Sequence, residues 1–221
     1  MAQVHLTFDN GPDPEVTPRV LGVLERRGLR ATFFVLGKHL ATDEGMEMAR
    51  RIRDAGHRLG NHSYSHEIPL GQDPRKGTVE RELARTEALL DKVYDGPKLF
   101  RPFGGGGILG PHLFSPASVE WLAARGYTCV TWNSVPGDWL DPDAWVEHAL
   151  EDAEQLDEMV LVLHDILPDA MTHLDAFLDA LEARGHTLTD TIAPSCLPMV
   201  DGVAGPELAS FTQDPEQSSP P

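Results

Sequence analysis

The sequence predicts an α/β protein whose core is an irregular (β/α) barrel of about seven parallel strands. Short runs rich in β-branched and aromatic residues alternate with longer stretches of helical period over most of the 221 residues. The short runs are apolar throughout, as in strands that are covered on both faces. No hairpin signal joins consecutive runs, so successive β-then-α units predict a parallel sheet wrapped by helices.

An open doubly wound sheet is the main alternative. We favour the barrel because the chain does not open with the glycine-rich βαβ unit of dinucleotide-binding proteins. Gly105, Gly107 and Gly110 do satisfy G-x-G-x-x-G, but Pro111 and His112 stand where the following helix would have to begin. We therefore expect this glycine run to form a flexible rim around a site.

The strands are expected where the apolar runs lie. Most of these runs end in a polar residue or are followed by a turn signal. In chain order they cover 4–8, 31–36, 57–61, 98–101, 127–132 and 159–164, with a weaker run at 186–189.

The helices are expected between these runs, bounded by capping and breaking residues. Thr17 is a candidate N-cap for the first, with Pro18 in its first turn and Gly28 after its end. Ser115 before Pro116 marks a second start of this kind. The remaining helices are expected at 44–56, 78–94, 115–126, from 141 onward, and 171–184.

One domain is expected over residues 1–200, because a chain of this length can bury a single core. Residues 201–221 are rich in Pro, Ser, Gly and acids and are expected to form a flexible tail. Cys129 and Cys196 have the spacing of neither a disulfide framework nor a thiolate metal site, so we expect both to be reduced and structural.

The charge balance excludes two classes of partner. Against 35 acidic residues stand 18 Lys and Arg, a formal net charge of −17, with no basic run that could neutralise phosphates. Neither nucleic acid nor a membrane is expected as a partner. Residues 1–6 do not resemble a secretory leader, so a cytoplasmic location is expected. The sequence leaves open whether the chain forms a homo-oligomer.

Strongly polar residues follow the predicted strands. In parallel α/β folds the site lies where strands end and the next loops begin, so these side chains are expected to converge. They are Asp9 and Asn10 after the first strand, His62 and His66 after the third, Arg101 after the fourth, Asp138 and Trp139 after the fifth, and His164 and Asp165 after the sixth.

His62 and His66 are four residues apart, and on one helical turn both imidazoles would face a common point, as zinc or a similar ion requires. Such a pair also arises by chance in a chain with ten His. Here it lies at a strand end and faces a carboxylate. Two His and one oxygen ligand form the open arrangement of catalytic zinc, with room left for water.

His164 and Arg101 each have a structural and a functional interpretation. His164 could be a satisfied core residue, but its position opposite a metal site favours acid–base catalysis. Arg101 could be a solvent-exposed cation, but its place after an apolar strand suits it to orient a carboxylate bidentately. Trp139 would form a pocket wall, and Asp138 would orient an imidazole or a guanidinium.

Five motifs in order resemble those of the NodB-homology polysaccharide deacetylases, also called carbohydrate esterase family 4. They are TFDNGP, NHSYSH, FRPFG, GDW and LVLHD, and ATFFVLG resembles the family's second strand. The resemblance spans about residues 4–165. It implies a distorted barrel with a divalent metal that removes N- or O-acyl groups. Zinc is the metal expected for this chain, with cobalt or nickel as alternatives.

The resemblance also implies roles for single residues. The family commonly has R-P-P-Y-G where this chain has R-P-F-G, and a backbone N–H of the Phe103–Gly104 turn would stabilise the oxyanion. Asp9 matches the catalytic base, Arg101 the residue that positions it, His164 the general acid and Asp138 the residue that tunes it. His62 and His66 match metal ligands, and Phe103, Trp139 and Leu163 match substrate-binding residues.

Asn10 falls where the family usually has a metal-binding Asp. A carboxamide keeps an oxygen donor but removes a negative charge, which predicts weaker metal binding and a more acidic metal-bound water. Asp9 could also act as a ligand, at the expense of its role as base.

The function expected is metal-dependent hydrolysis of non-peptide C–N bonds, of deacetylase type, on an N-acetylated sugar, a short oligosaccharide or a small amide. The alternative is a catalytically impaired deacetylase-like binding protein that has lost its metal.

Overall fold

A computed structural model of the chain describes residues 1–215. Within them the strands form one nine-stranded sheet in the order β6-β1-β2-β3-β4-β5-β8-β9, with β7 also paired to β1. The strands are β1 Gln3–Asp9, β2 Thr32–Val35, β3 Arg58–Asn61, β4 Leu99–Phe100, β5 Thr128–Cys129, β6 Glu158–His164, β7 Thr187–Leu188, β8 Met199–Val200 and β9 Val203–Ala204.

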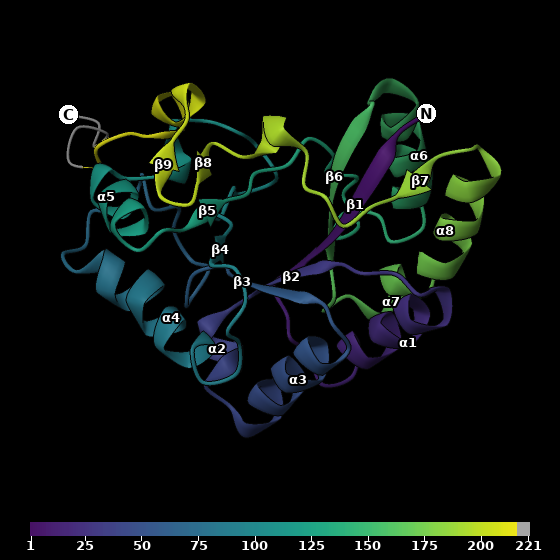
Figure 1. The fold of residues 1–221 in the computed structure, drawn as a ribbon, viewed down its shortest axis with the longest axis horizontal. Coiled ribbons are helices and arrows are strands. Elements are labelled where there is room, and N and C mark those ends of the chain that lie inside the picture. The colour runs from purple at the N-terminus through teal and green to yellow at the C-terminus, as the bar shows by residue number, and fades with distance from the viewer. Residues whose placement is uncertain (216–221) are drawn as a thin grey trace.

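The first seven strands are parallel, and the sheet curls into the irregular barrel that the sequence predicts. An isolated parallel bridge between Ser134 and Leu161 links the segment after β5 back to β6. The helices lie around the outside of the strands (Figure 1). β1 and β6 pair along their whole length, and the last pair of the register is Asp9 with His164. This register brings two predicted site residues together at the carboxyl end of the sheet.

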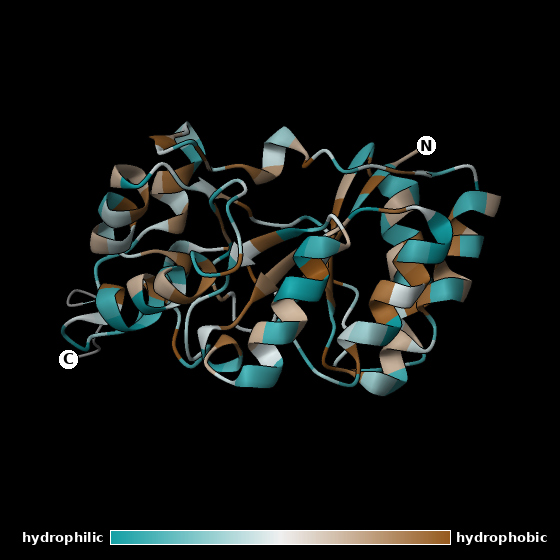
Figure 2. Ribbon diagram, turned by 60° about the horizontal axis from the view of Figure 1, so that its bottom comes forward, coloured by the Kyte–Doolittle hydropathy of each residue, from teal (hydrophilic) through white to brown (hydrophobic). Residues whose placement is uncertain are grey.

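The helices bury apolar faces against the sheet and turn polar faces outward (Figure 2). The core packs Phe8 of β1 against Phe33 of β2, with ring centroids 5.0 Å apart. The helices are α1 Thr17–Arg27, α2 Gly37–Leu40, α3 Asp43–Asp54, α4 Arg85–Leu90, α5 Pro116–Ala124, α6 Trp145–Gln155, α7 Pro168–Met171 and α8 Leu174–Ala183, with η1 Val79–Ala84, η2 Pro111–Leu113, η3 Pro194–Cys196 and η4 Pro206–Phe211.

Two helix ends follow the predicted signals and one does not. Gly28 ends α1 in the left-handed conformation at φ 64°, and Ser115 caps α5 in a capping box with Ser118. Thr17 is not an N-cap but the first residue of α1. Its hydroxyl instead accepts a hydrogen bond from the Asp13 backbone N–H, 2.8 Å away, and donates to Asp165.

Two predicted helices begin differently from expectation. The segment expected at 78–94 opens as the π-helix η1 before α4. The helix expected from 141 begins at Trp145, because the Asp141 carboxylate accepts hydrogen bonds from the N–H groups of Asp143 and Ala144 and closes a turn there.

The C-terminal segment is ordered further than the sequence predicted. β8 and β9 form an antiparallel hairpin, so the sheet is mixed rather than parallel throughout, and η4 follows with Leu208 only 3% exposed. A bridge between Phe114 and Thr212 ties the segment to the body. In place of the tail expected from Asp201, residues 201–213 therefore form β9, η4 and hydrogen bonds of Gln213 to Phe114 and Gly71. The remainder of that tail, 216–221, lies outside the described residues.

Two smaller findings complete the fold. Cys129 and Cys196 are both buried and free, as predicted. In the described part of the chain, no helix has the length and apolarity needed to cross a membrane.

Candidate active site

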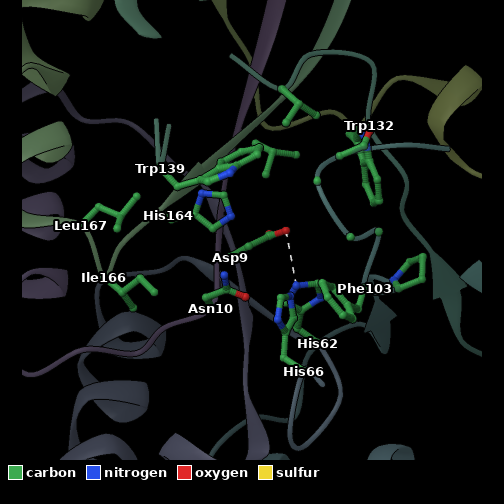
Figure 3. Close-up of a pocket in the computed structure, with 17 residues that line it drawn as sticks. Asp9, Asn10, His62, His66, Phe103, Trp132, Trp139, His164, Ile166 and Leu167 are labelled. Atoms are coloured by element: carbon green, nitrogen blue, oxygen red, sulfur yellow. Dashed lines mark hydrogen bonds and ion pairs between the residues drawn. The ribbon is translucent and has the colours of Figure 1, made fainter. Parts of the chain in front are cut away.

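Seven of the predicted site residues line a cavity of about 300 Å³ at the carboxyl end of the parallel strands: Asp9, Asn10, His62, His66, Phe103, Trp139 and His164. Arg101 and Asp138 lie behind it and hydrogen-bond to Asp9 and His164. Asp9 lies between His164 on one side and His62 and His66 on the other (Figure 3). Phe103 and Trp139 also line the cavity, as the family resemblance implied.

Arg101 orients Asp9 by donating a hydrogen bond to one of its carboxylate oxygens. It is fully buried, and its Nη1 donates to Asp9 Oδ1 at 2.8 Å and to Thr7 Oγ1 at 2.6 Å. The expected bidentate pair does not form, because Nε and Nη2 donate to the backbone carbonyls of Val130 and Thr131. Asp9 Oδ2 is thereby left 3.6 Å from the Nε2 atom of His62. One carboxylate oxygen is fixed by the protein and the other faces the cavity.

The imidazole of His62 is oriented by a backbone carbonyl. Its Nδ1 lies 2.8 Å from the Arg101 carbonyl oxygen, and because a carbonyl only accepts, Nδ1 carries the proton and Nε2 keeps its lone pair. The His62 and His66 ring centroids are 4.9 Å apart. Burial lowers the pKa of His62, and burial with the neighbouring imidazoles lowers the pKa of His66 to about 2. Both rings are therefore neutral and able to ligate a metal.

The two His side chains come from a loop and not from the helical turn that the spacing suggested. Ser63 and His66 have φ of 67° and 57°. The buried Glu82 carboxylate of η1 holds the loop by accepting hydrogen bonds from the N–H groups of Tyr64 and Ser65, at 3.0 and 2.8 Å, and from the Ser65 hydroxyl at 2.8 Å. Sequence reasoning missed Glu82, since nothing in its pattern distinguishes it from a solvent-exposed acid on a helix.

Asn10 offers the third donor. Its backbone is left-handed, at φ 74°, a conformation that Asn tolerates better than most residues. Its side-chain oxygen is buried and points toward the two imidazoles (Figure 3), and none of residues 1–215 gives it a hydrogen bond. An unpaired buried amide oxygen destabilises the folded state by its lost hydration, so we infer that this atom binds a ligand.

These three side chains fit a divalent metal. Asn10 Oδ1, His62 Nε2 and the His66 imidazole provide one oxygen and two nitrogen donors around one cavity. Among the described residues, no group of three or more His, Cys, Asp or Glu is arranged to hold a metal ion. The donor set here depends instead on the amide of Asn10.

Asp138 holds His164. Its Oδ1 accepts from His164 Nδ1 and its Oδ2 from the His164 backbone N–H, both at 2.8 Å, so Nε2 remains for the cavity. Burial opposes protonation of His164, but the hydrogen bond to Asp138 and the charges of Asp138, Asp9 and Asp165 outweigh it and raise the pKa of His164. Trp139 packs edge-on against the ring, with centroids 5.2 Å apart.

The prediction that Leu163 lines the pocket is wrong. Leu163 is fully buried in the core on the opposite face of β6, where it pairs with Phe8. Because successive strand residues alternate between faces, the cavity receives Val162 and His164 instead. Residues that the sequence reasoning did not single out also line the cavity: Trp132, Val135, Ile166 and Leu167.

The glycine run forms part of the cavity wall, in the place predicted. Gly105, Gly106 and Gly107 have φ between 54° and 80°, which only glycine adopts readily. Trp132 Nε1 donates to the Gly107 carbonyl at 2.8 Å, and the His112 ring hydrogen-bonds the Gly104 carbonyl at 3.0 Å, so the loop is tethered at both ends. The glycine run is followed by the three-residue helix η2 and not by the long helix that a nucleotide site requires.

The polysaccharide deacetylase family model matches residues 2–128, more than half of the chain. The chain belongs to the polysaccharide deacetylase family. A peptidoglycan-N-acetylglucosamine deacetylase of Bacillus cereus is 30% identical over 166 residues, covering 73% of this chain and 72% of the relative. The matches to the next curated relatives span only 46% and 37% of their length.

Solved structures of deacetylases and esterases share the fold. A peptidoglycan N-acetylglucosamine deacetylase in complex with 4-naphthalen-1-yl-N-oxidanyl-benzamide aligns at TM-score 0.72 and 26% identity, covering 90% of this chain and 89% of that one. A family 4 acetyl xylan esterase of Clostridium thermocellum, in complex with a cobalt ion, aligns at TM-score 0.66 and 29% identity over 85% and 87% of the chains. By family and fold, the chain is a polysaccharide deacetylase-like amide hydrolase.

Proposed function

We propose that this deacetylase-family chain is a metal-dependent amide hydrolase of deacetylase type that acts on an N-acetylated sugar, a short oligosaccharide or a small amide. The observation that carries the proposal is a carboxylate and an imidazole, Asp9 and His164, side by side at the ends of neighbouring strands in one cavity. An Asn10 oxygen without a hydrogen-bond partner among the described residues lines the same cavity. Hydrolysis of an amide needs a base for the attacking water and an acid for the leaving amine, and these two residues supply them.

Asn10, His62 and His66 would hold the metal. A divalent ion held there, zinc or alternatively cobalt or nickel, would supply Lewis acidity toward the acyl carbonyl and would make water more acidic. With one amide in place of an acid, the three donors carry no charge when both imidazoles are neutral, so they bind the ion less tightly than a set with a carboxylate would.

Asp9 acts as the base. Arg101 fixes Oδ1, so that Oδ2 is presented to the cavity and takes the proton of the attacking water. The oxyanion that forms needs hydrogen-bond donors. Within the described residues, the N–H groups of Phe103 and Gly104 donate to no protein acceptor, and both residues line the cavity. They are the donors we assign to it.

His164 acts as the acid. Asp138 holds Nδ1 and favours the imidazolium, so Nε2 carries a proton that it can donate to the amine as the C–N bond breaks. Without this proton the amine is a poor leaving group. Asp138 and His164 thus form an acid unit that is separate from the Asp9–Arg101 base unit.

Acetate and amine release, measured across acetylated sugars and small cyclic amides, tests the proposal against the impaired binding protein. We expect release by the wild type loaded with zinc or cobalt and loss of at least about 100-fold in His164→Ala, the scale of one acid–base group. If no panel member is hydrolysed and the protein binds acyl sugars unchanged, the binding-protein alternative is correct.

A further inference from the structure

We propose that Asp165 is a positioning residue for the metal site. Together with Thr17 it fixes the turn of residues 10–13, and so the direction in which the Asn10 amide oxygen points. The inference rests on the proposed function, in which Asn10 is a metal ligand. It assigns a role to a buried acid that the proposed reaction does not use.

The carboxyl group of Asp165, the residue after His164, is enclosed by protein. Asp165 is 1% exposed and does not line the cavity, so it is not placed to touch a substrate or an ion there. None of residues 1–215 gives its Oδ1 a hydrogen bond. Acidic side chains are almost never fully buried unless they are paired, because burial removes their hydration. The groups that this carboxyl contacts therefore indicate its role.

The carboxyl group packs on Gly11, the residue that follows Asn10. A Cβ atom added at Gly11 would overlap both carboxyl oxygens of Asp165. The backbone of Gly11 is not left-handed, so its conformation does not by itself require glycine. Glycine is required here because the acid lies directly against the turn.

Thr17 links the same carboxyl group to the other end of the turn. Its hydroxyl donates to Asp165 Oδ2, and its oxygen accepts the Asp13 N–H at 2.8 Å. The Asp13 carboxylate in turn accepts from the N–H groups of Glu15 and Val16, both at 2.8 Å, just before α1. Asp165 and Thr17 thus hold both ends of the turn from one side.

The segment of β2 and the residue after it hold the turn from the other side. The Asn10 N–H donates to the Phe34 carbonyl at 3.2 Å, and the Leu36 N–H donates to the Gly11 carbonyl at 2.9 Å. Between these supports Asn10 keeps its left-handed backbone, which persists only where the surroundings fix it. Because an amide attracts a cation less than a carboxylate does, its value as a ligand depends on being aimed before the ion arrives.

The test measures cobalt binding to the metal-free full chain by the visible spectrum of the bound ion, and not the rate of a reaction. We expect Asp165→Ala to weaken cobalt binding about ten-fold, the scale on which residues that orient metal ligands act. Asp165→Asn keeps the shape of the side chain and an oxygen for the Thr17 hydroxyl, so its affinity should stay within about three-fold of the wild type.

Wild-type affinity in Asp165→Ala overturns the inference and leaves the proposed function intact. Asp165→Asn that binds cobalt as weakly as Asp165→Ala also overturns it, because charge and not position would then be what matters. A wild type that binds no cobalt overturns the proposed function and this inference together.

Thr17→Val removes the hydroxyl with little change of shape and tests the same contact from α1. We expect it to weaken cobalt binding several-fold. The double variant with Asp165→Ala should bind no more weakly than Asp165→Ala alone, since both changes break one unit. Losses that simply add overturn the inference. If Asp165→Ala does not fold, Thr17→Val carries the test, and an unchanged cobalt affinity in it overturns the inference.

Two controls separate positioning from a loss of stability. Leu208→Ala truncates a side chain that is 3% exposed in another core cluster, so it should lower the urea midpoint and leave cobalt affinity unchanged. Asp169→Asn, at an exposed acid four residues after Asp165, should change neither. Equal weakening of cobalt binding in Leu208→Ala and Asp165→Ala would overturn the inference, because lost stability would account for both.

Discussion

At the scale of single residues, Asn10 is the feature that most distinguishes this site. Its amide oxygen is buried beside two neutral imidazoles and has no hydrogen-bond partner in the described part of the chain. The metal would therefore sit among uncharged donors, with the Asp9 carboxylate held away as a base by Arg101. Under the proposed function, such donors would bind the metal weakly and leave it more positive, which would make a water bound to it more acidic.

Asn10→Asp tests the first consequence. Restoring a carboxylate at this position adds a negative charge to the donor set, so cobalt should bind at least about ten-fold more tightly. The measurement is a titration of the metal-free protein with Co²⁺, followed by its visible spectrum. Equal affinities in the two proteins would show that Asn10 is not a ligand.

Asp138→Asn tests the acid unit through its pH dependence. The pKa of His164 is raised in the wild type, so the acid form persists to higher pH and activity falls only as pH rises through that pKa. Removing the Asp138 charge lowers the pKa, and the alkaline limb of the kcat profile should move to lower pH, by about one unit or more. Asp143→Asn, at a side chain that is 88% exposed, is the control and should leave the limb in place.

The motifs predicted which polar residues come together in the cavity because each follows a strand, and parallel strands bring their carboxyl ends to one edge. They could not predict which oxygen of Asp9 is free, since the other donors of Arg101 are taken by backbone carbonyls that only the folded chain brings near. Leu163 was assigned to the wrong face because a motif match does not fix strand alternation as the register with β1 does.

At the scale of elements, the π-helix η1 positions the loop that carries His62 and His66. It directs the Glu82 carboxylate onto the N–H groups of Tyr64 and Ser65, just before His66. It also brings the Leu83 carbonyl to the side-chain N–H of Asn61, 3.1 Å away. Single-turn π-helices of this kind often occur at functional sites. The sequence predicted helix here but not the wider turn, because helical periodicity does not distinguish the two.

Glu82→Gln tests this function of η1. The Gln side chain has one acceptor in place of two, so His66 should lose its fixed orientation and cobalt should bind about ten-fold more weakly, in the range seen for residues that orient ligands. Glu80→Gln, at an exposed position of the same helix, is the control. Unchanged cobalt affinity in Glu82→Gln, alongside a lower urea midpoint, would restrict Glu82 to a structural role.

At the scale of the whole molecule, the long β1–β6 pairing forms the rigid centre on which the site is built, and the C-terminal segment packs against the opposite end of the sheet order. The strand runs and their order along the chain were predictable from periodicity. The β8–β9 hairpin was not, because its strands are two residues each and lie in Pro- and Gly-rich sequence.

Leu208→Ala tests whether the C-terminal segment belongs to the cooperative fold. Leu208 is 3% exposed in a cluster with Phe114 and Met199, so its truncation should cost about 2–4 kcal/mol in the free energy of unfolding. Urea unfolding measures the loss. Val203→Ala, at a side chain that is 72% exposed, should cost less than about 0.5 kcal/mol. Equal small losses in both variants would show that the segment contributes little to stability.

The central claim is that Asp9 and His164, which lie side by side in one cavity, hydrolyse an amide with the help of a metal held by Asn10, His62 and His66. Its most direct test is amine release from an N-acylated glucosamine series by the wild type, Asp9→Asn and His164→Ala, each with zinc or cobalt and with a chelator. The account predicts release only by the metal-loaded wild type, with losses of at least about 100-fold in both variants. Release that persists under chelation, or is unchanged in either variant, would contradict it.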